Sequence, residues 1–169
     1  LNVMFLLDVS GSQYDFRAGM KEFAVDFAKF VNVTAGNHVS AMIIGSTWST
    51  VIGPSTCTTE ACVEAAINGI PDPAGIARVG TGMEALKAVF VQPYNASEYQ
   101  DVAVVVTDGN FVHDYGYADV ITAANNLDKL NVELYAIGTT DAHASNLEYI
   151  TNGYSDAILT AATAEDLGF

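Results

Sequence analysis

Apolar and polar residues alternate along the chain in a pattern that predicts strands and helices following one another. Short runs of continuously apolar residues indicate buried strands, and apolar residues spaced three and four positions apart indicate helices that pack on them. The predicted strands cover residues 3–9, 39–45, 47–52, 101–107, 132–137 and 157–159. The predicted helices cover residues 14–31, 59–68, 82–91, 117–130 and 146–150. This alternation is typical of an α/β fold in which a doubly wound, mostly parallel central sheet carries helices on both faces.

Three segments indicate how the predicted elements pack. The helix over residues 14–31 has an aromatic stripe that we expect to pack on the sheet. The stripe consists of Phe16, Met20, Phe23, Phe27 and Phe30. The short turn between the strands over 39–45 and 47–52 predicts an antiparallel hairpin. The strand over 101–107 contains four valines within five residues, which is typical of a strand with both faces covered.

The composition favours one globular domain and excludes two classes of partner. Half of the 169 residues are hydrophobic and no repeat or low-complexity linker divides them, so we expect a single domain over residues 1–169. With 20 acidic and 6 basic residues the formal net charge is -14, which argues against nucleic acid because phosphate binding needs clustered Lys and Arg. The same charge argues against anionic lipid. No apolar run approaches the roughly 18 residues needed for membrane insertion.

Two cysteines and two glycosylation sequons indicate in which cellular compartment the protein is located. Cys57 and Cys62 lie five positions apart at a predicted helix entrance, where they could close a small disulfide loop. A metal site there would need further Cys or His ligands nearby, and the sequence has none. Asn32 and Asn95 each begin an Asn-x-Ser/Thr sequon in a polar stretch. Together these features predict an extracellular location, either secreted or in the ectodomain of a cell-surface protein.

Two acidic residues follow predicted strands and mark a candidate metal site. Asp8 ends the first strand and Asp108 follows the most apolar one, so both should emerge at the same edge of the sheet. Two such carboxylates repel each other unless a cation or a proton lies between them. Asp8, Ser10 and Ser12 have Asp-x-Ser-x-Ser spacing, which places three short oxygen side chains where they can converge. Carboxylate and hydroxyl oxygens are the ligands that Mg²⁺ and Mn²⁺ prefer.

These motifs resemble the metal-ion-dependent adhesion site of von Willebrand factor type A domains, a fold shared with integrin inserted domains. The residues that carry the resemblance are Asp8-Val9-Ser10-Gly11-Ser12, Thr81 ahead of a helix, and Thr107-Asp108-Gly109. The resemblance extends over essentially the whole chain in the order of the elements. The family's mainly parallel sheet has one antiparallel edge strand, which agrees with the predicted hairpin.

The resemblance implies a role for each residue at the metal. Ser10 and Ser12 would ligate the ion directly, while Asp8 and Asp108 would act directly or through water. The ion would be Mg²⁺, with Mn²⁺ or Ca²⁺ as alternatives. Its remaining coordination position would accept a Glu or Asp carboxylate from a partner protein.

The threonine of the site departs from the family's usual pattern, which resembles Gly-Thr-x-Thr-Gly-x-Ala-Leu. Residues 79–86 read Val-Gly-Thr-Gly-Met-Glu-Ala-Leu, which is one or two residues tighter. If the helix register is kept, the metal-facing position is Gly80. If the loop before the helix is one residue shorter, the position is Thr81, which we take as the fifth member of the site.

The resemblance implies an extracellular adhesion module that captures protein ligands, for example matrix proteins such as collagen. A matrix scaffold module that binds independently of metal is an alternative. A metal-assisted phosphoester hydrolase with Asp8 as nucleophile is a third, although such enzymes typically have an acid at the position of Ser10. The chain has no G-x-S-x-G motif, and a dinucleotide-like pattern at residues 80–85 has no strand before it. We therefore expect no enzymatic activity.

Overall fold

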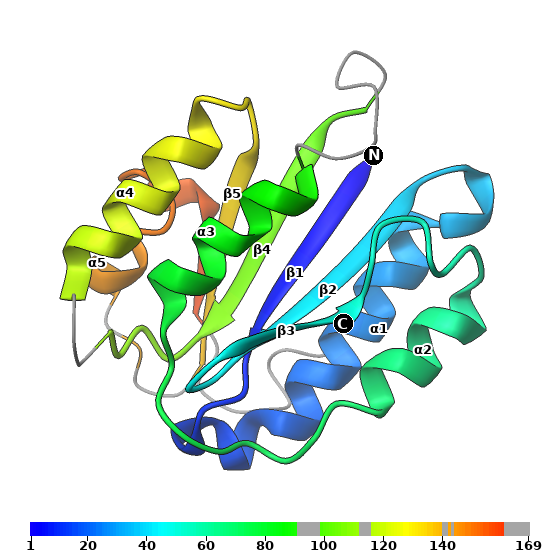
Figure 1. Cartoon of the computed structure of the whole chain (residues 1–169), viewed down its shortest axis with the longest axis horizontal. Coiled ribbons are helices and arrows are strands. Elements are labelled where there is room, and N and C mark those ends of the chain that lie inside the picture. Colours follow the sequence, from blue (N-terminus) through cyan, green and yellow to red (C-terminus); the bar gives the residue numbers. More distant parts are fainter. Residues whose placement is uncertain (91–98, 112–115, 140–141, 143, 161–169) are drawn as a thin grey trace.

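The computed structural model describes residues 1–90, 99–111, 116–139, 142 and 144–160. Six strands form one sheet in the order β3-β2-β1-β4-β5-β6 (Figure 1). The strands are β1 Asn2–Asp8, β2 His38–Ile44, β3 Trp48–Ile52, β4 Asp101–Thr107, β5 Glu133–Gly138 and β6 Ile158–Thr160. Strand β3 pairs antiparallel with β2, and all other pairs are parallel. The predicted α/β fold with its mostly parallel sheet and antiparallel edge strand is confirmed.

Helices cover both faces of the sheet and create two cores. The α-helices are α1 Arg17–Val31, α2 Glu60–Asn68, α3 Val79–Phe90, α4 Gly116–Asp128 and α5 Ala144–Leu147. Short 3-10 helices occupy η1 Gly11–Phe16, η2 Val33–Ala35 and η3 Ser155–Ala157. Side chains of α1 and α2 share one buried core with Phe5 of β1, and side chains of α3, α4 and α5 share the other with Leu6. Because successive side chains of a strand point to opposite faces, a strand covered on both sides is apolar throughout.

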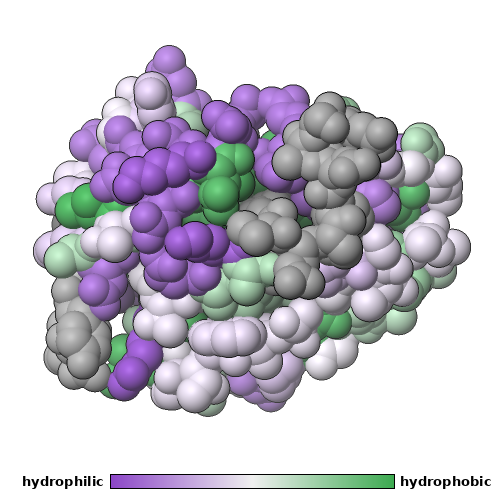
Figure 2. Space-filling view, turned by 45° about the horizontal axis from the view of Figure 1, so that its top comes forward, coloured by the Kyte–Doolittle hydropathy of each residue, from purple (hydrophilic) through white to green (hydrophobic). Residues whose placement is uncertain are grey.

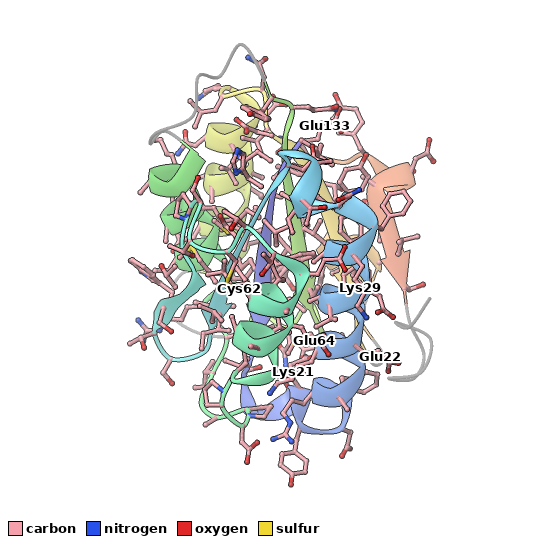
Figure 3. The ribbon with its side chains drawn as sticks, turned by 90° about the vertical axis from the view of Figure 1, so that its right-hand side faces the viewer. Lys21, Glu22, Lys29, Cys62, Glu64 and Glu133 are labelled. Atoms are coloured by element: carbon pink, nitrogen blue, oxygen red, sulfur yellow. A yellow bond between two sulfur atoms is a disulfide. The ribbon has the colours of Figure 1, made fainter. Side chains whose placement is uncertain are left out.

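Polar contacts join the two helices on the first face. Figure 3 shows α1 and α2 side by side, with Lys21 reaching from α1 towards the end of α2. The ammonium group of Lys21 donates hydrogen bonds to the backbone oxygens of Asn68, at 3.0 Å, and Ile70, at 2.6 Å. These oxygens lie at and beyond the carboxyl end of α2, where carbonyls have no helical partner and a positive charge is favourable.

The predicted helix bounds differ from the structure in several places: α5 covers Ala144–Leu147 instead of 146–150, and α4 ends at Asp128 instead of 130. Three further differences concern packing. The helix expected over 14–31 begins as η1, and α1 starts only at Arg17. Phe30 is 84% exposed instead of packing on the sheet, because Val31, four positions after Phe27, takes the buried place in the last turn. Helix α3 begins at Val79, three residues earlier than expected. Val79 extends the buried stripe of Met83 by one turn, so the first turn is held by the core as well.

The face drawn in Figure 2, which turns the top of Figure 1 towards the viewer, combines hydrophilic side chains with side chains of intermediate hydropathy. Strongly hydrophilic side chains gather at the upper left, and the hydrophobic areas among the coloured atoms are small and separate. None of the helices in the described part of the chain is both long and apolar enough to cross a membrane.

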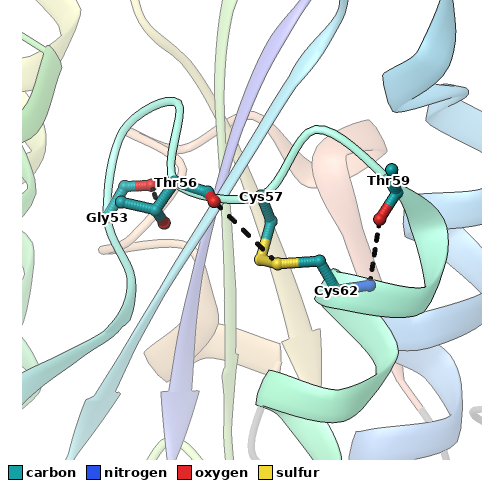
Figure 4. Close-up of a disulfide and its surroundings, with 5 residues drawn as sticks. All are labelled: Gly53, Thr56, Cys57, Thr59 and Cys62. Carbon is teal, nitrogen blue, oxygen red and sulfur yellow. Dashed lines mark hydrogen bonds between the residues drawn. A yellow bond between two sulfur atoms is a disulfide. The ribbon is translucent and has the colours of Figure 1, made fainter.

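A disulfide joins Cys57 and Cys62 where the chain enters α2 (Figure 4). The hydroxyl of Thr59, the residue before the helix, accepts a hydrogen bond from the backbone N–H of Cys62 at 3.3 Å. Cys57 is buried in the same core as Val63, so the bridge links the loop after β3 to the helix and to the sheet beneath it.

Removing this disulfide should lower the free energy of unfolding by about 2 kcal/mol, because a short loop is no longer closed in the unfolded chain. The variant is Cys57→Ala/Cys62→Ala, measured by urea unfolding. Thr59→Ala removes the helix cap but keeps the disulfide, and it should lower the free energy of unfolding by about 1 kcal/mol. It shows how much stability the cap of α2 contributes without the disulfide. An unfolding midpoint equal to that of the parent protein would contradict the prediction.

Candidate metal centre

The two acidic strand ends lie next to each other in the fold. Strands β1 and β4 are parallel neighbours with Leu7 opposite Val106, so Asp8 and the residues after Thr107 leave the sheet at the same edge. In Figure 1 this edge is at the bottom, where β1 passes into the dark blue η1. The topology therefore brings together the two motifs that the sequence separates by about a hundred residues.

The loop after β1 holds three oxygen-bearing side chains in a tight turn. The backbone N–H of Ser10 donates to Asp8 Oδ1 at 2.8 Å, and the hydroxyls of Ser10 and Ser12 lie 3.0 Å apart. Asp8 and Ser10 are buried, whereas Ser12 is exposed. The arrangement presents two neutral oxygens side by side next to a buried carboxylate.

Thr107 fixes the other oxygen of the buried carboxylate. Its hydroxyl donates to Asp8 Oδ2 at 2.8 Å, across 99 positions of sequence, and accepts from the backbone N–H of Gly109 at 3.2 Å. The sequence places Thr107 in the motif but gives it no role of its own. The structure makes it the contact that orients Asp8.

Asp108 provides a second carboxylate that is only partly buried. Its Oδ1 accepts a hydrogen bond from the backbone N–H of Asn110 at 2.9 Å. The next residue, Gly109, has φ +71°, and a Cβ there would lie 3.3 Å from the side chain of Leu147. Glycine allows the chain to turn sharply after Asp108 and keeps this acid at the edge of the sheet.

The electrostatics of the site favour a bound cation. The pKa of Asp8 is raised to about 6, chiefly because the carboxylate is buried and also because Asp108 carries a negative charge nearby. Hydrogen bonds from Ser10 and Thr107 lower this pKa without cancelling the effect of burial. Among the described residues, neither Asp8 nor Asp108 forms a salt bridge. Oxygen ligands with uncompensated negative charge suit a hard divalent ion such as Mg²⁺.

The loop that leads to α3 is bonded directly to the loop after β1. The backbone N–H of Ala74 donates to the oxygen of Val9 at 2.7 Å, and that of Gly11 donates to the oxygen of Gly75 at 3.0 Å. The loop between α2 and α3 therefore lies at the same edge of the sheet as the loop after β1.

Thr81 itself lies in the first turn of α3 with an exposed side chain. Within the described residues, no polar contact joins it to Asp8, Ser10, Ser12 or Asp108. The flanking glycines face elsewhere: a Cβ on Gly80 would lie 2.8 Å from that of Asp119 in α4, and one on Gly82 would lie 3.0 Å from Leu6. Gly80 thus packs against α4, which favours the second register alternative over the first. Thr81 as a ligand stays a prediction.

Gln13 and Thr139 form a buried pair beside the site that sequence reasoning missed. Thr139 Oγ1 donates to Gln13 Oε1 at 2.6 Å, across 126 positions of sequence. Gln13 Nε2 is buried without a hydrogen-bond partner among the described residues. Exchanging the two atoms of the amide would leave its oxygen unpaired instead. An unpaired buried polar atom costs on the order of 1–3 kcal/mol, so this glutamine is not explained by stability.

A mixed sheet covered by helices on both faces, with oxygen-rich loops at its carboxyl edge, defines an open α/β domain of the doubly wound class. Within this class the chain belongs to the von Willebrand factor type A domain family, whose model matches residues 2–168. A comparison with curated proteins finds no significant match.

Solved structures of low sequence identity share the fold. Proximal thread matrix protein 1 (PTMP1) from the mussel byssus is 21% identical with a TM-score of 0.88, and the match covers 98% of this chain and 44% of that one. A second structure of PTMP1, with a zinc-occupied MIDAS motif, is 20% identical with a TM-score of 0.85 and the same coverage. The manganese-loaded TRAP protein of Plasmodium vivax is 14% identical with a TM-score of 0.82, covering 99% of this chain and 70% of that one. The chain thus spans less than half the length of PTMP1.

Proposed function

We propose that this chain is a protein-binding module whose contact with its partner depends on a divalent cation. The observation that carries the proposal is the buried carboxylate of Asp8, which stands beside Asp108 with no salt bridge among the described residues. A cation at this point would compensate both negative charges.

The ligands would come from the carboxyl ends of β1 and β4 and from the first turn of α3. Ser10 and Ser12 would bind the ion directly, Asp8 and Asp108 directly or through water, and Thr81 would complete the set. Such oxygen ligands fit Mg²⁺ best, and Mn²⁺ or Ca²⁺ also accept them. The zinc in PTMP1 and the manganese in TRAP support a divalent ion in this fold.

The partner would be a protein that offers a Glu or Asp carboxylate. A divalent ion held by two carboxylates and neutral hydroxyls can still accept one anionic ligand. The net charge of -14 repels acidic surfaces at longer range, so we infer a partner whose ligating acid is surrounded by basic residues. We propose a binding role without catalysis, since the described residues around Asp8 and Asp108 offer no pair of nucleophile and base.

An extracellular setting fits the chemistry of the surface. The disulfide favours an oxidising compartment. Asn32 lies in an exposed turn where Thr34 Oγ1 donates to its Oδ1 at 2.6 Å, which leaves its amide nitrogen free of this contact. Asn95 lies outside the described residues. We propose residues 1–169 as one secreted or cell-surface domain, with Asn32 and Asn95 as glycosylation sites and matrix proteins such as collagen as the class of partner.

A scaffold role is the second candidate, supported by the matrix protein PTMP1 among the structural neighbours. A scaffold of this kind would make its contacts through the surface and would not need the cation. Its binding to matrix proteins would then be indifferent to EDTA and to loss of Asp108.

The test is calorimetric titration of Mg²⁺ into the metal-free protein, compared with Asp108→Ala and Asp101→Asn. Asp101 lies at the opposite end of β4, where its Oδ1 accepts from Asn2 Nδ2 at 2.8 Å, so Asp101→Asn removes an acidic charge without touching the site. We expect a single site that Asp108→Ala removes and Asp101→Asn preserves. Binding lost equally in both variants would reduce the effect to general electrostatics, and no binding by the parent protein would overturn the proposal.

The partner is tested with the same variants on immobilised collagen. Capture that disappears in EDTA and with Asp108→Ala supports the adhesion module. Capture unaffected by both supports the scaffold.

A further inference from the structure

We propose that Gln13 is a positioning residue that holds the metal-binding loop in place through Thr139. This inference rests on the proposed function, because it concerns the same site. Gln13 directly follows Ser12, is fully buried and makes its side-chain hydrogen bond to the end of β5.

The contacts around the site close into a hydrogen-bond ring. Ser10 N–H donates to Asp8 Oδ1, and Gln13 N–H donates to the oxygen of Ser10 at 3.0 Å. Thr139 donates through its hydroxyl to Gln13 and through its N–H to the oxygen of Thr107 at 3.0 Å. Thr107 in turn donates to Asp8 Oδ2 and closes the ring. The ring therefore joins the ends of β1, β4 and β5 to η1.

Gln13 is the member of the ring that ties η1 to β5. Its backbone restrains Ser10 and its side chain reaches across to Thr139, so the turn that carries Ser10 and Ser12 is held from both sides. A metal site needs its ligands preorganised by contacts of this kind behind them. Without the side-chain contact, the exposed Ser12 end of the turn would lose its anchor on the sheet.

The unpaired amide atom separates this role from a merely structural one. Methionine at position 13 would fill a similar volume and remove the unpaired amide atom, but it would leave the buried Thr139 hydroxyl without this acceptor. Thr139→Val would leave both polar atoms of the Gln13 amide without a partner among the described residues, so it should cost more stability than Gln13→Met. If the contact serves the metal loop, both variants should weaken ion binding equally although they differ in stability, whereas a purely structural contact would weaken binding in proportion to the loss of stability.

The experiment compares Gln13→Met, Thr139→Val and their double variant, each titrated with Mg²⁺ alone and melted in EDTA. We expect Gln13→Met and Thr139→Val each to bind Mg²⁺ about 10-fold more weakly, with a lower melting temperature in EDTA for Thr139→Val than for Gln13→Met. Because both single variants open the same contact, the double variant should bind no more weakly than the weaker single one. Thr139→Val reports on the same contact should Gln13→Met fail to fold.

A matched control is Ser40→Ala in the interior of β2, which removes a second buried polar group that has no hydrogen-bond partner among the described residues. It should leave Mg²⁺ binding unchanged. Equal Mg²⁺ affinity in the parent and Gln13→Met, or additive losses in the double variant, would overturn the positioning role while leaving the proposed function intact. Absence of Mg²⁺ binding by the parent would overturn both.

Discussion

Replacing Asp8 by asparagine is expected to abolish divalent-ion binding and at the same time make the metal-free protein more stable. The carboxylate is fully buried, and its pKa is raised from 3.8 to about 6. At about 1.4 kcal/mol per pKa unit, keeping this group ionised at neutral pH costs the folded state about 3 kcal/mol. Asparagine keeps the shape and can still accept from Ser10 N–H, but it carries no charge, so most of this cost should disappear.

The effect of Asp8 on stability has a defined pH window. Because the pKa of Asp8 is higher in the folded than in the unfolded protein, the folded protein binds the Asp8 proton more tightly. The stability that the protonated carboxyl group contributes is therefore fully present below pH 3.8 and is lost as pH rises through about 6. In EDTA, the stability difference between Asp8→Asn and the parent should therefore grow in favour of the variant between pH 5 and pH 7.5. Urea unfolding at both pH values measures it.

Loss of the metal is the other half of the same result. Outer contacts of metal ligands typically contribute 10–100-fold in affinity, so removing a carboxylate of the site should cost more than about 100-fold. Mg²⁺ should then stabilise the parent but not the variant in thermal melts. Asp101→Asn, which neutralises an acid at the far end of β4, serves as the control and should keep the response to Mg²⁺. A variant that is less stable than the parent in EDTA at pH 7.5 would refute the assignment of Asp8 as an uncompensated buried charge.

The sequence predicts the neighbourhood of the site better than its internal contacts. The sequence predicts that Asp8 and Asp108 lie close together, because both follow strongly apolar strands and the carboxyl ends of parallel strands lie at one edge of the sheet. The hydrogen bond from Thr107 to Asp8 joins residues 99 positions apart, and the one from Thr139 to Gln13 joins residues 126 apart. No local pattern records such pairs, because they depend on which strands become neighbours and in what register.

The boundaries of helices fail for a related reason. The aromatic spacing in the first helix suggested that Phe30 packs on the sheet, whereas Val31 supplies the last buried contact. Aromatic and aliphatic residues next to each other satisfy the same pattern, and only the packed sheet decides between them. The start of α3 at Val79 has a greater consequence, because it decides which residue of the segment Val79-Gly80-Thr81 can face the metal.

A valine at position 80 is expected to destabilise the protein by about 3 kcal/mol, the upper end of the usual cost of overpacking. Helices α3 and α4 lie side by side in Figure 1, and a Cβ at Gly80 would approach the Cβ of Asp119 to 2.8 Å and the backbone N of Val120 to 2.9 Å. Backbone atoms cannot move aside as the end of a flexible side chain can, so the two helices would have to separate. Urea unfolding in EDTA measures the loss without any contribution from metal.

Thr81→Val is the matched control, since it places the same side chain one position along the same helix turn. Thr81 is exposed and makes no polar contact with described residues of the site, so its stability in EDTA should stay within about 0.5 kcal/mol of the parent. The Mg²⁺ affinity of Thr81→Val also distinguishes the two register alternatives. If the Thr81 hydroxyl is a ligand, replacing it by a methyl group should weaken Mg²⁺ binding. If Gly80→Val is as stable as the parent, position 80 does not contact α4. That result would favour the register alternative in which Gly80 faces the metal.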